Sequence, residues 1–307
     1  MKKNQFSKMQ YWLIFKQELY LIRMKLIITT YIILLAFIEI PAQDFIFKNS
    51  IGDFKHASSL YINPAGIIIV TDDLTDEVYQ LDTLGNLIKS IGGYGWNIEA
   101  FDDPVDVFST ALNIYVTDKN NHRIQSFDKN LNFIFEFYKR ESENADERFG
   151  YPESAVQSNQ GDVIILDSEN KRILKFNIFG DFIQTIGSYD YGEYTLSDPK
   201  RLAVSMKNDI YVLDDEVIFI YDNYGTPLGL IEIPGGIVSI RIIFQWLTIN
   251  SENIVYLMNT NSTQKKLKEV RLTGYDRDFE IVSSIFYNSK LYLLTHEHIL
   301  IFSPSFD

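Results

Sequence analysis

Three histidines are the side chains of this sequence best suited to hold a metal ion. His296 and His298 stand two residues apart in the segment THEHIL, so in an extended chain both point to the same face. His56 supplies a third ligand only if the two ends of the chain meet. Several histidines on one ion are typical of zinc sites. Turn histidines that bind no metal are commoner, so we expect no cofactor, with Zn²⁺ or Ca²⁺ as the alternative.

Aspartates recur at the ends of four apolar runs, at Asp72, Asp118, Asp167 and Asp214. A ring of carboxylates on one face could hold Ca²⁺, which takes six to eight oxygen ligands. These aspartates recur once per repeat, however, and would therefore lie a repeat apart rather than around one ion. We favour a structural interpretation, in which each carboxylate caps the turn that follows by accepting backbone N–H groups.

Aromatic residues and arginines gather in three long connections, at residues 92–104, 138–152 and 187–199. Exposed aromatic rings with nearby arginines are typical of binding surfaces, and sugars also stack on such rings. The structural alternative is that the rings pack over strand ends and hold the connections in place. The candidate ligand-binding residues are Tyr94, Trp96, Arg140, Arg148, Tyr189, Tyr191 and Tyr194.

The sequence offers no convergent catalytic set. It contains no cysteine, so neither a thiolate nucleophile nor a disulfide can form. It also lacks a G-x-S-x-G motif and a glycine-rich phosphate loop between a strand and a helix. We therefore name no catalytic residue and favour a binding protein over an enzyme.

The segments that must position these residues repeat along the chain. The runs IIIVTD, IYVTD, VIILD and IYVLD end in the recurrent aspartates, and VYLMN and LYLLT place Asn259 and Thr295 in the same slot. Each repeat of roughly 45 residues contains four short apolar segments with turn-forming residues between them. Four short strands per repeat are typical of a propeller blade, so six copies predict an all-β, six-bladed β-propeller.

The two ends of the chain complement each other. The sixth copy has no fourth strand after residues 298–303, whereas residues 43–53 (QDFIFKNSIGD) resemble the fourth strands at 85–93 and 180–188. We expect residues 43–53 to pair with residues 298–303, complete the last blade and close the ring. Closure would remove two exposed sheet edges, which otherwise invite aggregation.

The repeat resembles the NHL repeat, which forms six-bladed propellers. The resemblance rests on Pro104 with NIYVTDKNNHRIQSFD, on Pro152 with VIILDSENKRILKFN and Gly180, and on Pro199 with IYVLDD. The last two copies lack the opening proline and the N-x-R-I element. Arg123 and Arg172 stand at equivalent positions, and we expect each to pair with acids of the neighbouring blade. The resemblance implies a fold and leaves function open, because the family includes lyases, RNA- and protein-binding scaffolds and envelope proteins.

The N-terminal segment has the outline of an export signal. Residues 26–38 (LIITTYIILLAFI) carry no charge, follow Arg23 and Lys25, and precede Pro41 and Ala42. Thirteen apolar residues are short for a membrane span, which needs about 20. We expect residues 1–43 to be an export signal, with translation starting at Met24, or an uncleaved membrane anchor. Residues 44–307 would then form the propeller in the periplasm, on the cell surface or outside a bacterial cell, with the membrane contacted only through an uncleaved segment.

The charge of the chain excludes one class of partner. Residues 44–307 hold 22 Lys and Arg against 39 Asp and Glu, a net charge of −17. Such a body repels phosphate backbones, so we expect no nucleic-acid partner. The predicted function is a non-catalytic binding or assembly scaffold of the cell envelope, with a protein or glycan ligand on the loop face. The alternatives are a hydrolase or lyase with Ca²⁺ or Zn²⁺ in the central channel, and a carbohydrate-binding module.

Overall fold

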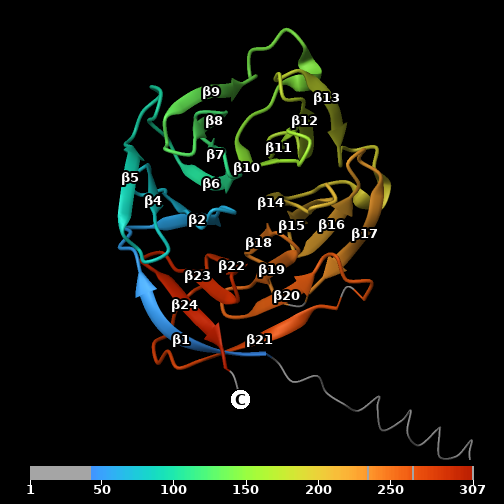
Figure 1. Cartoon of the computed structure of the whole chain (residues 1–307). Helices are drawn as coiled ribbons and strands as arrows, with labels where there is room; N and C mark the ends of the chain where they lie inside the picture. Colours follow the sequence, from blue (N-terminus) through green and yellow to red (C-terminus); the bar gives the residue numbers. More distant parts are fainter. Residues whose placement is uncertain (1–42, 234, 265, 306–307) are drawn as a thin grey trace, which may run out of the picture. The chain divides into compact units, whose positions relative to one another are not determined.

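The computed structural model describes residues 43–233, 235–264 and 266–305, which form 24 strands and two 3₁₀ helices (Figure 1). The predicted export signal lies outside these residues, apart from Gln43. The described part of the chain contains no helix with the length and apolar character needed to cross a bilayer.

Sixteen of the strands form four separate antiparallel sheets of four strands each. Blade 1 consists of β2 (Ala57–Ile62), β3 (Ile68–Asp72), β4 (Glu77–Leu81) and β5 (Leu87–Gly92). Blade 2 consists of β6 (Pro104–Ser109), β7 (Asn113–Asp118), β8 (Arg123–Asp128) and β9 (Phe133–Tyr138). Blade 3 consists of β10 (Pro152–Gln157), β11 (Val163–Asp167), β12 (Arg172–Phe176) and β13 (Phe182–Ile186). Blade 4 consists of β14 (Pro199–Val204), β15 (Ile210–Asp214), β16 (Val217–Tyr221) and β17 (Pro227–Glu232).

The sequence of each strand matches its place in the blade. The second strands β3, β11 and β15 are buried along their whole length, because their apolar side chains pack on the blades at both sides. The fourth strands β5, β9 and β17 are largely exposed, as expected for the solvent edge. Pro104, Pro152 and Pro199 each occupy the first residue of a strand, where the missing N–H costs no ladder hydrogen bond.

The remaining eight strands form one continuous sheet, which we call the closing sheet. It runs in the order β18 (Ser239–Ile243), β19 (Trp246–Asn250), β20 (Val255–Asn259), β21 (Lys268–Thr273), β1 (Gln43–Ile51), β24 (Ile299–Pro304), β23 (Lys290–Leu294) and β22 (Ser283–Tyr287). The prediction of six separate blades is therefore wrong: the structure has four separate blades and this eight-stranded sheet. The reason is that β1 has two edges, and its first residues also pair in parallel with β21, from Gln43↔Val270 to Ile46↔Thr273.

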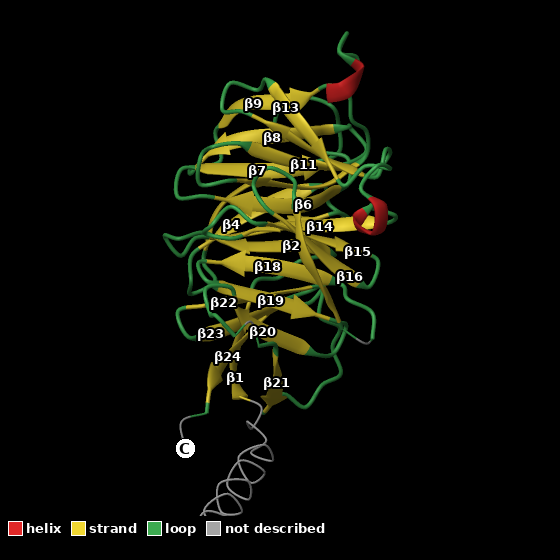
Figure 2. Cartoon of the chain, turned by 90° about the vertical axis from the view of Figure 1, so that its right-hand side faces the viewer, coloured by secondary structure: helices red, strands yellow, loops and turns green. Residues whose placement is uncertain are grey.

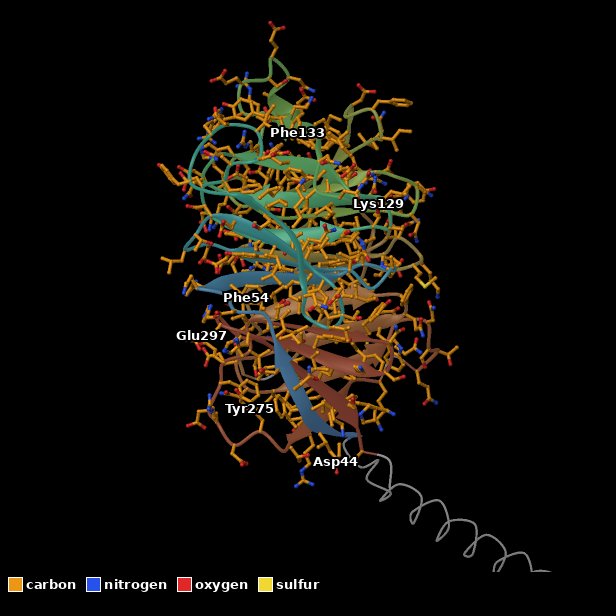
Figure 3. All side chains as sticks on the ribbon, turned by 60° about the vertical axis from the view of Figure 1, so that its left-hand side comes forward. Asp44, Phe54, Lys129, Phe133, Tyr275 and Glu297 are labelled. Atoms are coloured by element: carbon orange, nitrogen blue, oxygen red, sulfur yellow. The ribbon has the colours of Figure 1, made fainter. Side chains whose placement is uncertain are left out.

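The predicted pairing between the chain ends is confirmed. Strand β1 runs antiparallel to β24, from Phe45↔Pro304 to Ile51↔Ile299. The connection continues into blade 1, where the N–H of Phe54 donates to the carbonyl of Glu297 at 2.9 Å (Figure 3). The N–H of Ala57 donates to the backbone carbonyl of His296 at 2.8 Å. These bonds attach the closing sheet to the first blade.

The first strands of the repeats line a common axis. Strands β2, β6, β10, β14, β18 and β22 each contact the next, and β22 contacts β2. We call the side with the fourth-to-first and second-to-third connections the loop face, and the opposite side the turn face. The helices η1 (Ala145–Glu147) and η2 (Gly192–Tyr194) belong to fourth-to-first connections and lie on the same side in Figure 2.

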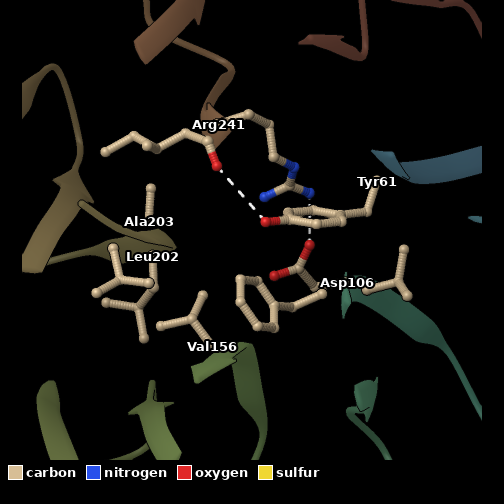
Figure 4. Close-up of a pocket in the computed structure, with 10 residues that line it drawn as sticks. Tyr61, Asp106, Val156, Leu202, Ala203 and Arg241 are labelled. Atoms are coloured by element: carbon tan, nitrogen blue, oxygen red, sulfur yellow. Dashed lines mark hydrogen bonds and ion pairs between the residues drawn. The ribbon is translucent and has the colours of Figure 1, made fainter. Parts of the chain in front are cut away.

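The axis is filled by a buried ion pair that the sequence pattern did not indicate. Arg241 on β18 reaches across to Asp106 on β6, with 2.5 Å between Nη2 and Oδ1. The same Nη2 donates to Ser59 Oγ at 2.8 Å, and Ser154 donates to the other oxygen of Asp106. The space left beside this pair is about 10 Å³ (Figure 4), which is room for about one water molecule.

Candidate binding surface on the loop face

The recurrent aspartates are buried and organise the loop face. Asp72 Oδ1 accepts the N–H groups of Leu74 and Thr75, both at 3.1 Å, which caps the turn after β3 as predicted. Its Oδ2 accepts the N–H groups of Lys55 and His56 at 2.7 and 2.9 Å. Asp72 thereby ties its turn to the segment that enters the same blade, and Asp167 does the same through the N–H of Asn170 at 3.4 Å. Among the described residues, Asp118 and Asp214 accept no backbone N–H of their turns and bond only the entering segment and nearby side chains. The equivalent entering partners are Asp102 for Asp118, Gly150 for Asp167, and Ser197 and Asp198 for Asp214.

Arg123 and Arg172 pair with aspartates of their own blades, so the prediction of partners in the neighbouring blade is wrong. Arg123 Nε lies 2.7 Å from Asp118 Oδ2, and Arg172 Nε lies 3.0 Å from Asp167 Oδ2. Each arginine stands directly opposite its aspartate across a hairpin. Opposed side chains on paired strands lie close enough to interact, so the partner is fixed by the register of the hairpin.

Arg123 also fixes the position of Trp96. Its Nη1 donates to the Trp96 carbonyl at 2.8 Å, and its guanidinium carbon lies 5.2 Å from the centroid of the indole ring. Its Nη2 donates to the carbonyls of Asn97 and Ala100, both at 3.0 Å. The ring of Tyr138 meets Trp96 edge-on at 5.6 Å. Trp96 is therefore held on both sides by the protein while 53% of its surface stays exposed.

A cleft of about 460 Å³ lies between the connection after β9 and the turn after β11. We call it the arginine cleft. Three guanidinium groups and one carboxylate line it, although the body of the protein carries a net charge of −17. Its lining residues are Arg140, Ala145, Arg148, Phe149, Glu169, Asn170 and Arg172.

The charged groups of the cleft hold defined positions. Arg140 donates to both oxygens of Glu169, at 2.7 and 3.1 Å, and these hydrogen bonds lower the pKa of Glu169. Arg172 Nη2 donates to the carbonyl of Arg148 at 2.7 Å. Arg148 uses its Nε to bond the carbonyl of Ser142 at 2.6 Å, and its two terminal nitrogens make no hydrogen bond to a described residue.

Gly150 makes room for the Arg140–Glu169 pair. A Cβ added at this glycine would lie 2.0 Å from Arg140 Nη1 and 2.1 Å from Glu169 Oε2. Its N–H also donates to Asp167 at 3.2 Å. The glycine therefore lets the backbone approach the ion pair closely.

Tyr151 and His122 extend this surface toward blade 2. The guanidinium of Arg140 lies 5.7 Å from the ring centroid of Tyr151, and His122 meets the same ring edge-on at 4.2 Å. The N–H of Tyr151 donates to His122 Nδ1 at 3.0 Å. Burial, and then the positive charge of Arg140, lower the pKa of His122. The imidazole is therefore neutral at neutral pH, as the hydrogen bond that it accepts requires.

The structure places the predicted tyrosines outside the arginine cleft and away from Tyr151 and His122. Tyr94 and Tyr189 are exposed, Tyr189 at 92% of its surface. The ring of Tyr191 packs against Tyr221 at 6.0 Å, and that of Tyr194 against Phe219 at 5.6 Å. Tyr191 and Tyr194 therefore hold their connection to blade 4, which is the structural alternative given for such rings.

Closure of the chain brings His56 and His296 together. Their rings stack with centroids 3.9 Å apart, and His56 Nδ1 lies 2.6 Å from Asp73 Oδ1. The Nδ1 atoms of His296 and His298 are directed to backbone carbonyls, those of Ala57 at 3.1 Å and Gly52 at 2.9 Å. Within the described ranges, no three His, Asp or Glu side chains are grouped so that they could hold a metal ion.

Trp96, Arg140 and Arg148 were candidates from sequence, whereas Tyr151, His122, Glu169 and Arg172 were not named as part of a surface. No local sequence pattern singles these residues out, because each contact joins residues far apart in the chain. Arg140 meets Glu169, and His122 meets Tyr151, in both cases 29 residues apart in the chain. Arg140 lies in the connection from blade 2 to blade 3, and Glu169 lies in the turn between the second and third strands of blade 3. His122 lies in the equivalent turn of blade 2, and Tyr151 lies in the connection from blade 2 to blade 3.

Comparison with known proteins supports the fold. Residues 149–176 match the family model of the NHL repeat. A stretch of 142 residues, 45% of this chain, is 34% identical to the protein brain tumor of Drosophila melanogaster, and it spans 13% of that protein.

Solved structures with a similar fold include two enzymes and a protein with WD40 repeats. A streptogramin B lyase matches with a TM-score of 0.58 and 13% identity, over 84% of this chain and 97% of its own. A gluconolactonase of Xanthomonas campestris matches with a TM-score of 0.58 and 11% identity, over 86% and 99%. The WD40 repeats of RRP9 match with the same TM-score and 11% identity, over 87% and 100%. At such identities the likeness shows the propeller fold alone. The chain therefore carries an NHL repeat at residues 149–176 and has the fold of a β-propeller.

Proposed function

We propose that this chain is a non-catalytic protein-binding module that binds an acidic segment of a partner protein on its loop face. The observation that carries the proposal is that Trp96, Tyr151 and the arginine cleft all belong to the loop face of one acidic protein. Aromatic rings and arginines supply most of the binding energy in protein interfaces. The rings are already held in place, so binding would cost little conformational entropy.

The chemistry of the cleft favours binding of carboxylates. Guanidinium groups form bidentate hydrogen bonds with carboxylates, which gives both charge and geometry. The carboxylate of Glu169 already makes this contact with Arg140 inside the cleft. Arg148 is exposed and offers its terminal nitrogens to a second carboxylate. Neither an arginine nor a carboxylate paired in this way is suited to act as a nucleophile or base at neutral pH.

A cell-envelope location is part of the proposal. It rests on the sequence of residues 23–42, which lie outside the described residues. Neither the fold nor the loop-face surface bears on this location.

Selection from a random library of 12-residue peptides displayed on phage would test the proposal. We would select against the full chain and, in parallel, against a Trp96→Ala/Arg148→Gln variant. We expect peptides rich in Asp and Glu to be enriched on the wild type and lost on the variant, with binding weakened by salt. A Tyr224→Ala/Lys207→Gln variant, altered at exposed positions of the turn face, should select the same peptides as the wild type. Identical selections on the wild type and the loop-face variant, or neutral peptides only, would contradict the proposal.

A further inference from the structure

A second hollow lies on the turn face, on the side of the molecule opposite the arginine cleft. Its volume is about 440 Å³, and it is surrounded by the first-to-second-strand connections of blades 1 to 4 and by the turn between β18 and β19. We call it the axial bowl. Its apolar lining includes Tyr61, Phe108, Val204, Met206, Ile242 and Phe244.

The axial bowl has a closed floor. The hydroxyl of Tyr61 donates to the carbonyl of Ile242 at 3.5 Å, and the ring of Tyr61 contacts that of Phe108 at 4.9 Å. Arg241 and Asp106 fill the axis next to these residues, and the space left there is only about 10 Å³ (Figure 4). A molecule that enters the bowl therefore meets a floor and cannot pass through the axis.

The lining of the bowl carries no formal charge. None of its 17 lining residues is Asp, Glu, Lys, Arg or His, although the protein as a whole has 22% charged residues. A charged ligand would lose its hydration there without gaining a partner. The composition of the bowl therefore favours a neutral occupant.

The polar groups of the bowl are mostly used by the protein itself. Thr110 Oγ1 accepts the N–H groups of Leu112 and Asn113 at 3.2 and 3.0 Å. Ser158 and Ser205 cap their own turns in the same way. A sugar would need many free donors and acceptors, so these contacts favour an apolar molecule with few polar groups.

Phe244 lines the axial bowl in a backbone conformation that phenylalanine rarely adopts. It has a φ of 53° in the two-residue turn between β18 and β19, a region in which a bulky side chain is strained and where Gly or Asn is usual. Even so, 44% of its surface is exposed, and its ring stacks on Tyr287 at a centroid distance of 6.3 Å.

We propose that the axial bowl binds a neutral, predominantly apolar small molecule. Its volume lies within the range of about 300–1,000 Å³ that is usual for small-molecule pockets. It also exceeds what a single inserted side chain would fill. The site is independent of the binding proposed for the loop face, because the two lie on opposite faces and share no lining residue.

Two matched alanines allow a direct test. Ala111 lines the axial bowl and Ala145 lines the arginine cleft, and both are exposed. The probe is N-phenyl-1-naphthylamine, a neutral dye that fluoresces when it leaves water. We would titrate it into the full chain and into Ala111→Trp and Ala145→Trp variants. Because the apolar residues 26–38 are the same in all three, differences in affinity report on the two hollows.

We expect saturable binding of one equivalent to the wild type and to Ala145→Trp, and at least tenfold weaker binding to Ala111→Trp at an unchanged melting temperature. Phe244→Gly should also weaken binding while the melting temperature stays equal or rises, since glycine relieves the strained φ. Absence of saturable binding, or equal affinity for wild type and Ala111→Trp, would overturn the proposal. So would a wild type that sediments as a dimer beside a monomeric Ala111→Trp, because the occupant would then be a second copy.

Discussion

Arg123 Nε lies 2.7 Å from Asp118 Oδ2, and both side chains are almost completely buried. The arginine continues to the carbonyls of Trp96, Asn97 and Ala100. One buried ion pair thereby connects the hairpin of β7 and β8 to the loop that presents Trp96. Stability of the blade and geometry of the binding surface thus depend on the same guanidinium group.

Removal of Asp118 should destabilise the protein more than removal of its counterpart Asp214. In Asp118→Ala the buried guanidinium of Arg123 keeps only the partly exposed Glu136 as an ionic partner, and breaking a buried ion pair costs about 3–5 kcal/mol. Asp214 accepts only from Ser197 and Asp198, so Asp214→Ala should cost about 1–3 kcal/mol for the unpaired groups. Urea unfolding of the two variants measures the difference. Equal losses of unfolding free energy would show that the Asp118–Arg123 ion pair adds no stability beyond the hydrogen bonds that both aspartates accept.

If β1 closes the ring, substitutions on its buried face should lower the free energy of unfolding more than substitutions on its exposed face. Phe45 is fully buried and meets Phe286 edge-on at 6.1 Å, whereas the next residue, Ile46, is partly exposed. We expect Phe45→Ala to lower the free energy of unfolding by about 3–5 kcal/mol and Ile46→Ala by about 1 kcal/mol. The same urea titration checks both variants. A Phe45→Ala variant as stable as the Ile46→Ala control would mean that β1 is not part of the cooperative fold.

Much of the fold could be predicted from the sequence because each repeat marks where its strands begin and end. The recurrent aspartates mark the ends of β3, β7, β11 and β15, and the surplus strand at one end matched a vacancy at the other. The parallel pairing of β1 with β21 was missed because an apolar pattern shows which face of a strand is buried but not which edges pair.

The candidate site could be predicted only in part. Composition singled out Trp96, Arg140 and Arg148, since aromatic and basic residues in long connections stand out in a sequence. Glu169, the partner of Arg140, and His122, the partner of Tyr151, are ordinary turn residues that become significant only through contacts 29 residues away. The pair of Arg241 and Asp106 lies 135 residues apart, and no local pattern connects two such positions.

His122 should make the stability of the protein depend on pH. Burial lowers its pKa in the folded state, so the unfolded chain binds more protons than the folded one below the ordinary histidine pKa of about 6.5. The contribution of His122 is complete above that pH and is lost as the pH falls through the folded pKa. We expect the melting temperature of His122→Asn to fall less than that of the wild type on acidification from pH 7.

Thermal melts of both proteins between pH 7 and pH 5 measure this difference. His56, which is also partly exposed on the loop face, provides the control variant His56→Asn. Parallel pH dependence of the wild type and His122→Asn would contradict the assignment of a neutral imidazole that accepts the N–H of Tyr151.

Gly150→Ala should alter the arginine cleft without removing any charged group. The new methyl carbon would lie about 2 Å from both Arg140 Nη1 and Glu169 Oε2, so the two flexible side chains must separate. The backbone at Gly150 does not have a positive φ, so alanine brings no backbone strain. We expect a change of about 1 kcal/mol or less in the free energy of unfolding, because an exposed ion pair contributes little.

Binding of the acidic peptides should change far more than stability. Once Arg140 is released from Glu169, it is free to bind a ligand carboxylate, so affinity should rise in Gly150→Ala and fall in Arg140→Gln. Fluorescence anisotropy of a labelled acidic peptide from the phage selection measures both. If the two variants bind with wild-type affinity, the Arg140–Glu169 pair does not control access to the cleft, and binding would have to depend on Arg148 and Trp96.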